Sequence, residues 1–498
     1  MSIVGVGTRS LLLTQSLVGM RAQLGDLQRQ LATGKRADDY AGIGINRGLT
    51  VGLRAHLSAI EGYGDTIKNI SGRLELAQTV LTRIGAIGRE TKAVAAQMSS
   101  VDGRATAQTS ATSALGELLG LLNTRSGDRF LFSGLATDQP AVASVSQILD
   151  GDGARAGLRQ IIAERLQADL GASGLGRLEV MTPSPTAAGL AEEAPPTIYG
   201  FKLSAITSTL TGATVTGPAG APPQVAVDLG ATNPNAGEAV RFTLSLPDGS
   251  TETLTLTATN SATPAPGEFA IGADSTETAT NLRAALTAEL GSRARTALTA
   301  ASALAASDDF FRTDDANPPR RVDGPPFDTA TGSVAGTAAD TVTWYTGEAG
   351  SQPARSTAVA KIDQSITVQY GLRANEEGIR WQLQNIAALA AISMPAGDPE
   401  SQARAEALTT RLRAAFDGPA GTQRIETIQA ELAGAQVSAD AAVDRHAQTK
   451  MTLGNLLQDI EGVTNEEVAA KILALQTSLQ ASLQTTAKLF QTSILNYL

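Results

Sequence analysis

A stripe of apolar residues near the start of the chain constrains the fold more than any other feature of the sequence. The stripe consists of Leu13, Leu17, Met20, Leu24, Leu27 and Leu31, at successive spacings of 4, 3, 4, 3 and 4 residues. This heptad spacing places all six side chains on one side of a helix. A lone amphipathic helix is marginal in water because it cannot bury its stripe. The sequence therefore predicts a helical partner, and the best candidates lie at the far end of the chain.

Two further stretches keep the same heptad pattern, over residues 60–84 and 425–460, and another apolar stripe covers residues 468–498. The last of them follows Thr464-Asn465-Glu466-Glu467, which has the form of a capping box at a helix start. Neither glycine nor proline occurs from Asn465 to Leu498. At about 1.5 Å per residue, this last helix is expected to be roughly 50 Å long.

Shorter elements lie between these long helices. We expect a helix over Thr106–Leu122, a short strand over Arg129–Gly134, and a return to helix at Glu376. Residues 141–375 differ in character, since prolines, threonines and valines become frequent. In this region the pattern predicts the following elements: a hairpin of 239–246 with 251–258, helices over 276–290 and 296–306, a loop over 312–326, and strands over 341–345 and 365–370.

The predicted fold is mostly α. Long coiled-coil-like helices at the two ends of the chain pack together, and an α+β, β-rich domain is inserted between them. The expected division is an N-terminal helical assembly domain at 1–140, the inserted variable domain at 141–375, and a C-terminal helical assembly domain at 376–498.

The composition excludes several classes of function. The chain has 498 residues and no cysteine, which rules out disulfides, thiolate nucleophiles and cysteine-ligated metals. A net charge of −10 argues against nucleic acid or an anionic membrane as the main partner. No apolar run approaches the roughly 20 residues that span a membrane. Residues 1–20 make a poor secretory signal peptide, so export from the cell would need another route.

The sequence offers no convincing active site. Of the two histidines, His446 falls on the apolar stripe of a long helix, where a packed histidine is the simpler interpretation, and His56 has no ligand partner nearby. The H-E-x-x-H pattern is missing, and Gly34-Lys35 lacks the remainder of a phosphate-binding loop. Asp150-Gly151-Asp152-Gly153 lacks the later calcium ligands of an EF-hand. We therefore predict no enzyme activity, no cofactor and no metal site.

Both ends of the sequence resemble bacterial flagellins and hook-associated proteins. The N-terminal similarity lies in Leu27–Arg36, followed by Asp38-Asp39 and Ala41-Gly42. The C-terminal similarity lies in Leu475–Leu483 and Ser493–Leu498. It covers about residues 1–140 and 400–498, and the middle would be the family's variable insert.

Within the family, two members compete. Gly127–Gly134, followed by Thr137-Asp138, is similar to the hook–filament junction protein, hook-associated protein 3, and the ending Leu495–Leu498 favours the same member. The alternative is flagellin, the filament subunit, because the insert is large for a junction protein. A surface glycan-binding module is a remote alternative from another class.

The resemblance implies a structural subunit that is exported unfolded by the flagellar type III apparatus and becomes part of an extracellular flagellum. Its terminal helices would then fold on assembly into nested α-helical tubes. The implied partners are other copies of the chain, neighbouring flagellar axial proteins and an export chaperone, with neither nucleic acid nor membrane insertion involved. The predicted assembly contacts are Leu13, Leu17, Met20, Leu24, Leu27, Leu31, Leu475, Leu479, Leu483, Phe490, Ile494 and Leu498.

Overall fold

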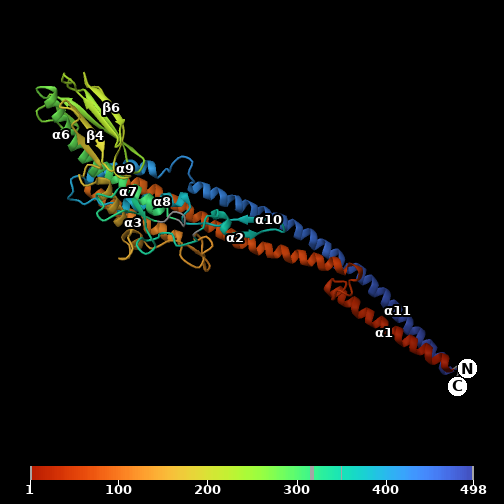
Figure 1. Ribbon diagram of the computed structural model, residues 1–498. Coiled ribbons are helices and arrows are strands. Elements are labelled where there is room, and N and C mark those ends of the chain that lie inside the picture. The colour runs from red at the N-terminus through yellow and green to blue at the C-terminus, as the bar shows by residue number, and fades with distance from the viewer. Residues whose placement is uncertain (1–2, 314–318, 349, 496–498) are drawn as a thin grey trace. The chain divides into compact units, whose positions relative to one another are not determined.

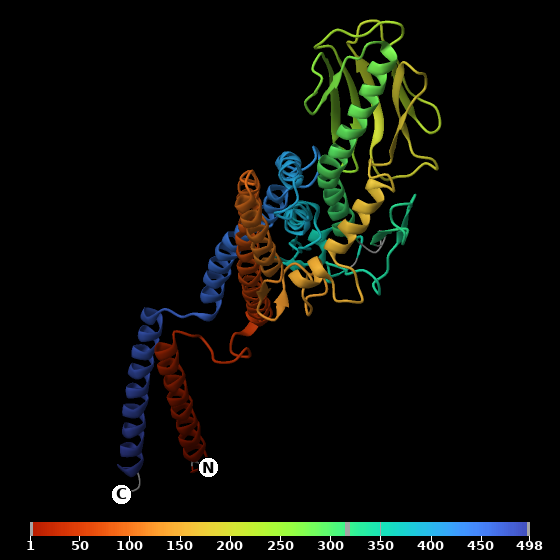
Figure 2. The same ribbon diagram turned by 90° about the vertical axis from the view of Figure 1, so that its left-hand side faces the viewer.

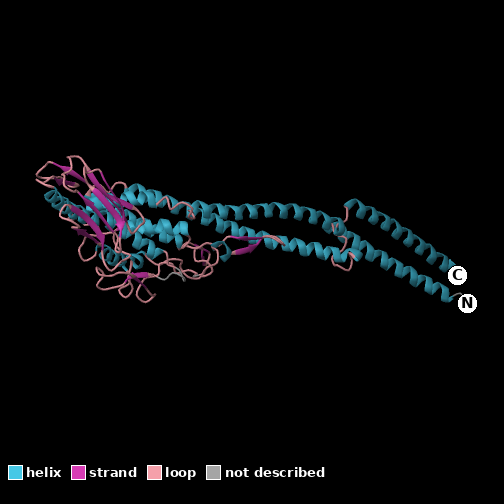
Figure 3. Cartoon of the chain, turned by 45° about the horizontal axis from the view of Figure 1, so that its top comes forward, coloured by secondary structure: helices cyan, strands magenta, loops and turns pink. Residues whose placement is uncertain are grey.

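A computed structural model describes residues 3–313, 319–348 and 350–495 (Figure 1), with side chains described between residues 11 and 488 of these ranges. The fold is mostly helical, and most of its strands lie in the inserted middle of the chain (Figure 3). This confirms the predicted fold class. The α-helices are α1 Ile3–Thr33, α2 Arg47–Ala95, α3 Val101–Leu122, α4 Val145–Asp150, α5 Leu158–Leu170, α6 Ser275–Arg293, α7 Thr299–Phe311, α8 Glu377–Ala391, α9 Ser401–Ala415, α10 Ile425–Glu461 and α11 Asn465–Leu495.

Short helical turns and strands complete the described part of the chain. The 3₁₀ turns are η1 Gly44–Asn46 and η3 Ala354–Thr357, and a π-helical turn, η2, covers Ala294–Leu298. The strands are β1 Arg125–Ser126, β2 Arg129–Phe130, β3 Leu178–Met181, β4 Ala187–Glu192, β5 Lys202–Ser208, β6 Thr214–Ala219, β7 Gln224–Asp228, β8 Ala239–Ser245, β9 Thr251–Thr259, β10 Glu268–Ala270, β11 Arg320–Val322, β12 Ser333–Ala335, β13 Val359–Lys361 and β14 Thr367–Gln369.

The contacts divide the chain into two compact units. We call the first the terminal unit; it comprises Met1–Ser71, Ala360–Val368 and Val437–Leu498. We call the second the central unit; it comprises Gly72–Val359 and Gln369–Gln436. The long helices α2 and α10 each contribute residues to both units.

In the terminal unit, α1 packs antiparallel to α11 (Figures 1 and 2). The predicted partner of the first apolar stripe is therefore the helix at the far end of the chain. Gly34 ends α1 with a φ of 68°, and its N–H donates to the carbonyl of Gln30 at 2.8 Å. Thr464 caps α11 as predicted, since its Oγ1 accepts from the N–H of Glu467 at 3.2 Å.

The connections between the helices of the terminal unit are tied to each other. The N–H of Arg36 donates to the carbonyl of Glu461 at 2.7 Å, and the N–H of Val463 donates to that of Gly34 at 3.1 Å. The Arg54 guanidinium holds both carboxylate oxygens of Glu461, at 3.0 and 2.6 Å. We call these contacts the connector clasp. The bond to Glu461 raises the pKa of Arg54.

The apolar stripe of α2 is buried along its length, as the spacing predicts. Its buried members are Ile60, Ile67, Ile70, Leu74, Ala77, Leu81 and Ile84. Within the terminal unit, the ring of Tyr63 lies 5.7 Å from the ring of His446, which is a packed histidine as expected. Within the central unit, Gln78 donates to the carbonyl of Gln429 at 2.8 Å, which ties α2 to the start of α10.

The predicted hairpin in the insert forms as β8 and β9, paired antiparallel in a sheet of order β10-β9-β8-β5. A second sheet has the order β3-β4-β7-β6. Helix α6 contacts strands of both sheets (Figure 2). Leucines at a helical period on α6, Leu282, Leu286 and Leu290, are fully buried there with Phe242 and Leu256.

Several local predictions need correction. Residues 341–345 do not form a strand: they make isolated bridges, with Trp344 and Tyr345 buried among aromatic rings. The expected loop at 312–326 contains β11, and the expected strand at 129–134 is reduced to β2. The prediction omitted α5 and α9. In the turn that follows α1, Oδ1 of Asp39 accepts a hydrogen bond from the N–H of Gly42 at 2.8 Å.

Candidate assembly interface

The paired helices α1 and α11 hold the residues predicted to make assembly contacts. On α1, the side chains of the stripe from Leu13 to Leu27 are half-buried, and this helix packs against α11. Leu31 remains 41% exposed at the end of the helix. On α11, Leu475 and Leu479 are half-buried, whereas Leu483 is 43% exposed. The side chains of Phe490 and Ile494, and all of Leu498, lie outside the described part of the chain.

The helix pair leaves much of its apolar surface uncovered. Among the side chains described, none on α1 is fully buried, and on α11 only Val468 is. A pair of helices can cover only the surfaces that face each other, so residues beside the seam stay in water. The seam is therefore only half closed by intramolecular contacts.

Large apolar side chains also lie off the predicted stripe. Leu11 and Leu12 are 71% and 65% exposed, and Leu473 is 65% exposed. The heptad pattern missed them because it selects only one stripe per helix. The run Leu11-Leu12-Leu13 carried the signal: three consecutive leucines cannot all face one partner. This is a helix with apolar surface for more than one neighbour.

A hollow of about 510 Å³ lies between α1 and α11. Its lining is mixed and includes Leu27 and Leu475 beside Gln23, Gln30 and Lys471. The charged groups nearby pair locally: Lys471 bonds Glu467 one turn away at 2.5 Å, which lowers the pKa of Glu467. These are exposed pairs of small energetic weight, so contacts here are set mainly by apolar area.

The stripe of α10 is buried from Ile425 to His446, and then its exposure changes. Leu456, which the heptad pattern placed on the stripe, is 43% exposed, whereas Leu453 and Leu457 are half-buried. Leu457 thus takes the place of Leu456 on the stripe at this end of α10, and Ile460 is again half-buried. An undistorted helix drifts relative to a strict seven-residue repeat, which accounts for such a shift.

The described residues provide neither a membrane span nor a metal site. None of their helices combines the length and apolar character needed to cross a bilayer. Nowhere in these residues do three or more His, Asp or Glu side chains group so that they could hold a metal ion.

The described fold is mostly α-helical, with paired terminal helices and a β-rich domain inserted in the middle of the chain. Residues 8–137 match the family profile of the bacterial flagellin N-terminal helical region. Over these residues the chain is similar to bacterial flagellins, and this match supports a flagellin-family protein and a structural subunit of the flagellum. Proteins of this family polymerise with copies of themselves in the flagellum, outside the cell. No curated protein matches the chain.

Proposed function

We propose that the chain is a junction subunit, which joins the hook to the filament and assembles through its terminal helices. The observation that carries the assembly role is the half-closed seam between α1 and α11. Leucines on both helices remain in water, although burying a leucine fully is worth about 1.5–3 kcal/mol. Contact with helices of neighbouring subunits would recover this free energy, and the predicted contacts from Leu13 to Leu31 and from Leu475 to Leu498 would lie in it.

The segment Gly127–Gly134 favours the junction over the filament, because its sequence is similar to that of junction proteins. In this chain the segment has a well-defined local structure. The N–H of Phe130 donates to the carbonyl of Thr137 at 2.9 Å, and Phe132 is fully buried. The Ser133 hydroxyl donates to the carbonyl of Gln139 at 2.9 Å. The segment therefore has a defined, partly buried structure within the central unit.

The filament subunit is the second candidate, and the size of the insert favours it. Residues 141–375 would form an outer domain, while 1–140 and 376–498 would form the assembly domains. A domain of this size is large for a junction protein, and it suits a filament subunit whose outer domain is exposed to the medium.

Immunogold labelling of whole cells with an antibody against the insert separates the two candidates. We expect gold only at the cell-proximal end of each filament. Gold along the whole filament would make this chain a flagellin, and flagella without gold would contradict both roles. As a control, cells that lack the protein should show no gold.

We further propose that the chain passes through the flagellar type III apparatus bound to a chaperone before export, with other axial proteins as its neighbours in the flagellum. Two features support this: there is no cysteine that could form a disulfide before export, and the terminal helices have unsatisfied apolar faces. Deletion of the export ATPase should retain the protein inside the cell. Its continued appearance in the medium would contradict this route.

A further inference from the structure

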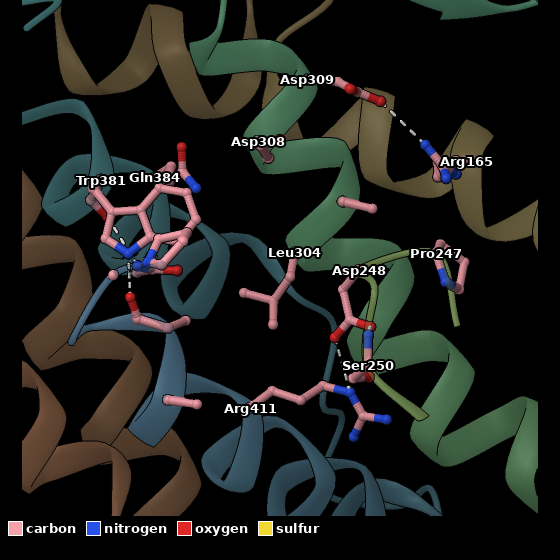
Figure 4. Close-up of a pocket in the computed structure, with 16 residues that line it drawn as sticks. Arg165, Pro247, Asp248, Ser250, Leu304, Asp308, Asp309, Trp381, Gln384 and Arg411 are labelled. Carbon is pink, nitrogen blue, oxygen red and sulfur yellow. Dashed lines mark hydrogen bonds and ion pairs between the residues drawn. The ribbon is translucent and has the colours of Figure 1, made fainter. Parts of the chain in front are cut away.

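The central unit contains a cavity that the assembly role does not use. Its volume is about 540 Å³ (Figure 4). Side chains from the β8–β9 turn, from α5 and from helices α7, α8 and α9 line it. The insert and the surrounding helices therefore build this cavity together, from segments far apart in the sequence.

Two acceptor atoms at the cavity have no hydrogen-bond partner among the described residues. One is Oε1 of Gln384 on α8, a side chain that is 4% exposed. The other is Oδ1 of Asp308 on α7, whose second oxygen bonds Arg312. A buried polar atom without a partner is destabilising, and more so when it is charged. These two acceptors therefore lack hydrogen-bond donors.

The arginines at the cavity do not donate to these two acceptors, because each arginine is already paired with carboxylates. Arg165 lies 2.9 Å from Asp169 and 3.1 Å from Asp309, and Arg411 lies 3.1 Å from Asp248. Figure 4 shows the Arg165–Asp309 and Arg411–Asp248 pairs beside the cavity. An anion would have to displace these carboxylates. The lining itself holds two arginines and three aspartates, so its net charge is negative.

An aromatic surface lies next to the unpaired acceptors. Trp381 lines the cavity and is held in place by a hydrogen bond from its indole N–H to the carbonyl of Ala415 (Figure 4). This bond fixes the ring at the wall of the cavity. An indole face attracts a cation electrostatically, and tryptophan does so best among the aromatic side chains.

We propose that this cavity binds an organic cation, a primary ammonium or a guanidinium. Such a group supplies N–H donors to Asp308 and Gln384, places its positive charge beside the unpaired carboxylate oxygen, and packs its carbon stem against Trp381. The same chemistry is found in a free polyamine and in a lysine or arginine side chain of another protein chain. The proposal holds for a junction subunit and for a filament subunit alike.

Titration of the full-length protein with spermidine, and separately with a short arginine- and lysine-containing peptide, tests the proposal. Trp381 fluorescence is the readout. The chain has two tryptophans, and the other, Trp344, is fully buried, so acrylamide quenches chiefly Trp381. We expect saturable protection of Trp381 from acrylamide by at least one cation. Tighter binding of spermidine points to a free polyamine, and tighter binding of the peptide to a protein partner.

Asp308→Asn should weaken this binding at least about tenfold, because it removes the charge that faces the cation. The matched control is Asp323→Asn, which neutralises an exposed carboxylate outside the cavity lining and should leave binding unchanged. Circular dichroism confirms that both variants fold. Three results would each overturn the proposal: no saturable effect of either cation, equal binding by the Asp308 variant, or protection by a neutral sugar such as trehalose in place of cations.

Discussion

Two leucines of α11 provide the most direct test of assembly through the terminal helices. The double substitution Leu479→Asp and Leu483→Asp places carboxylates at the half-closed seam. Covering the exposed 43% of Leu483 alone is worth about 1 kcal/mol, taken as that fraction of a leucine's full burial. Desolvating each new carboxylate at a subunit interface costs several kcal/mol more. Since 1.4 kcal/mol is a factor of ten, the critical concentration for polymerisation should rise by more than about a hundredfold.

The matched control introduces the same charge on the same helix. Gln476→Asp and Gln480→Asp alter exposed side chains away from the seam and should raise the critical concentration much less. Sedimentation of polymer after seeding measures that concentration, and the amount of protein in the medium measures export. Export should be normal in both variants. Polymerisation of the Leu479/Leu483 variant at the unmodified concentration would refute the reasoning.

Other predictions concern stability. Leu432→Ala empties a fully buried site on α10 and should cost about 2–5 kcal/mol in chemical denaturation, whereas Val443→Ala, on a half-exposed residue, should cost under about 1 kcal/mol. Gly34→Ala forces a side chain into the left-handed region and should lower terminal-unit stability by about 1–2 kcal/mol, measured by thermal unfolding. The pKa of Asp363 is lowered, mainly by the hydrogen bond from the N–H of Gln364. The stability that ionised Asp363 contributes is therefore present above the ordinary aspartate pKa and is lost as the pH falls through the lowered value. The protection of amides 360–368 against hydrogen exchange, expressed relative to the intrinsic exchange rate at each pH, should therefore fall in acid, and Asp363→Asn should remove that acid dependence.

The long helices could be predicted from the sequence because their signal is local and repeated. The stripes of α1, α2 and α10 each extend over several turns. An apolar repeat of that length at the helical period is compatible with few structures other than a helix. Even there the prediction reached its limit at Leu456. Its exposure depends on how far the helix drifts from a strict heptad, which the spacing alone does not record.

The insert was less predictable because strand pairing is decided by residues far apart in the chain. β6 is exposed along its whole length, so it has no alternation to detect, and it exists because β7 pairs with it. Residues Thr341–Tyr345 show the converse, since threonine, tryptophan and tyrosine favour strands but the segment has only isolated bridging partners. The cavity beside Gln384 was also hidden from sequence, because its lining comes from separate elements.

The connector clasp has a mechanical consequence. One backbone hydrogen bond joins the link after α1 to Glu461 at the end of α10, a second joins Gly34 to Val463 in the link before α11, and the Arg54–Glu461 pair joins α2 to the end of α10. A twisting load on either terminal helix is therefore divided between two chain segments at this level, and no single peptide link has to act as a free swivel. In a flagellar subunit, these contacts would resist rotation of the two terminal helices about this point.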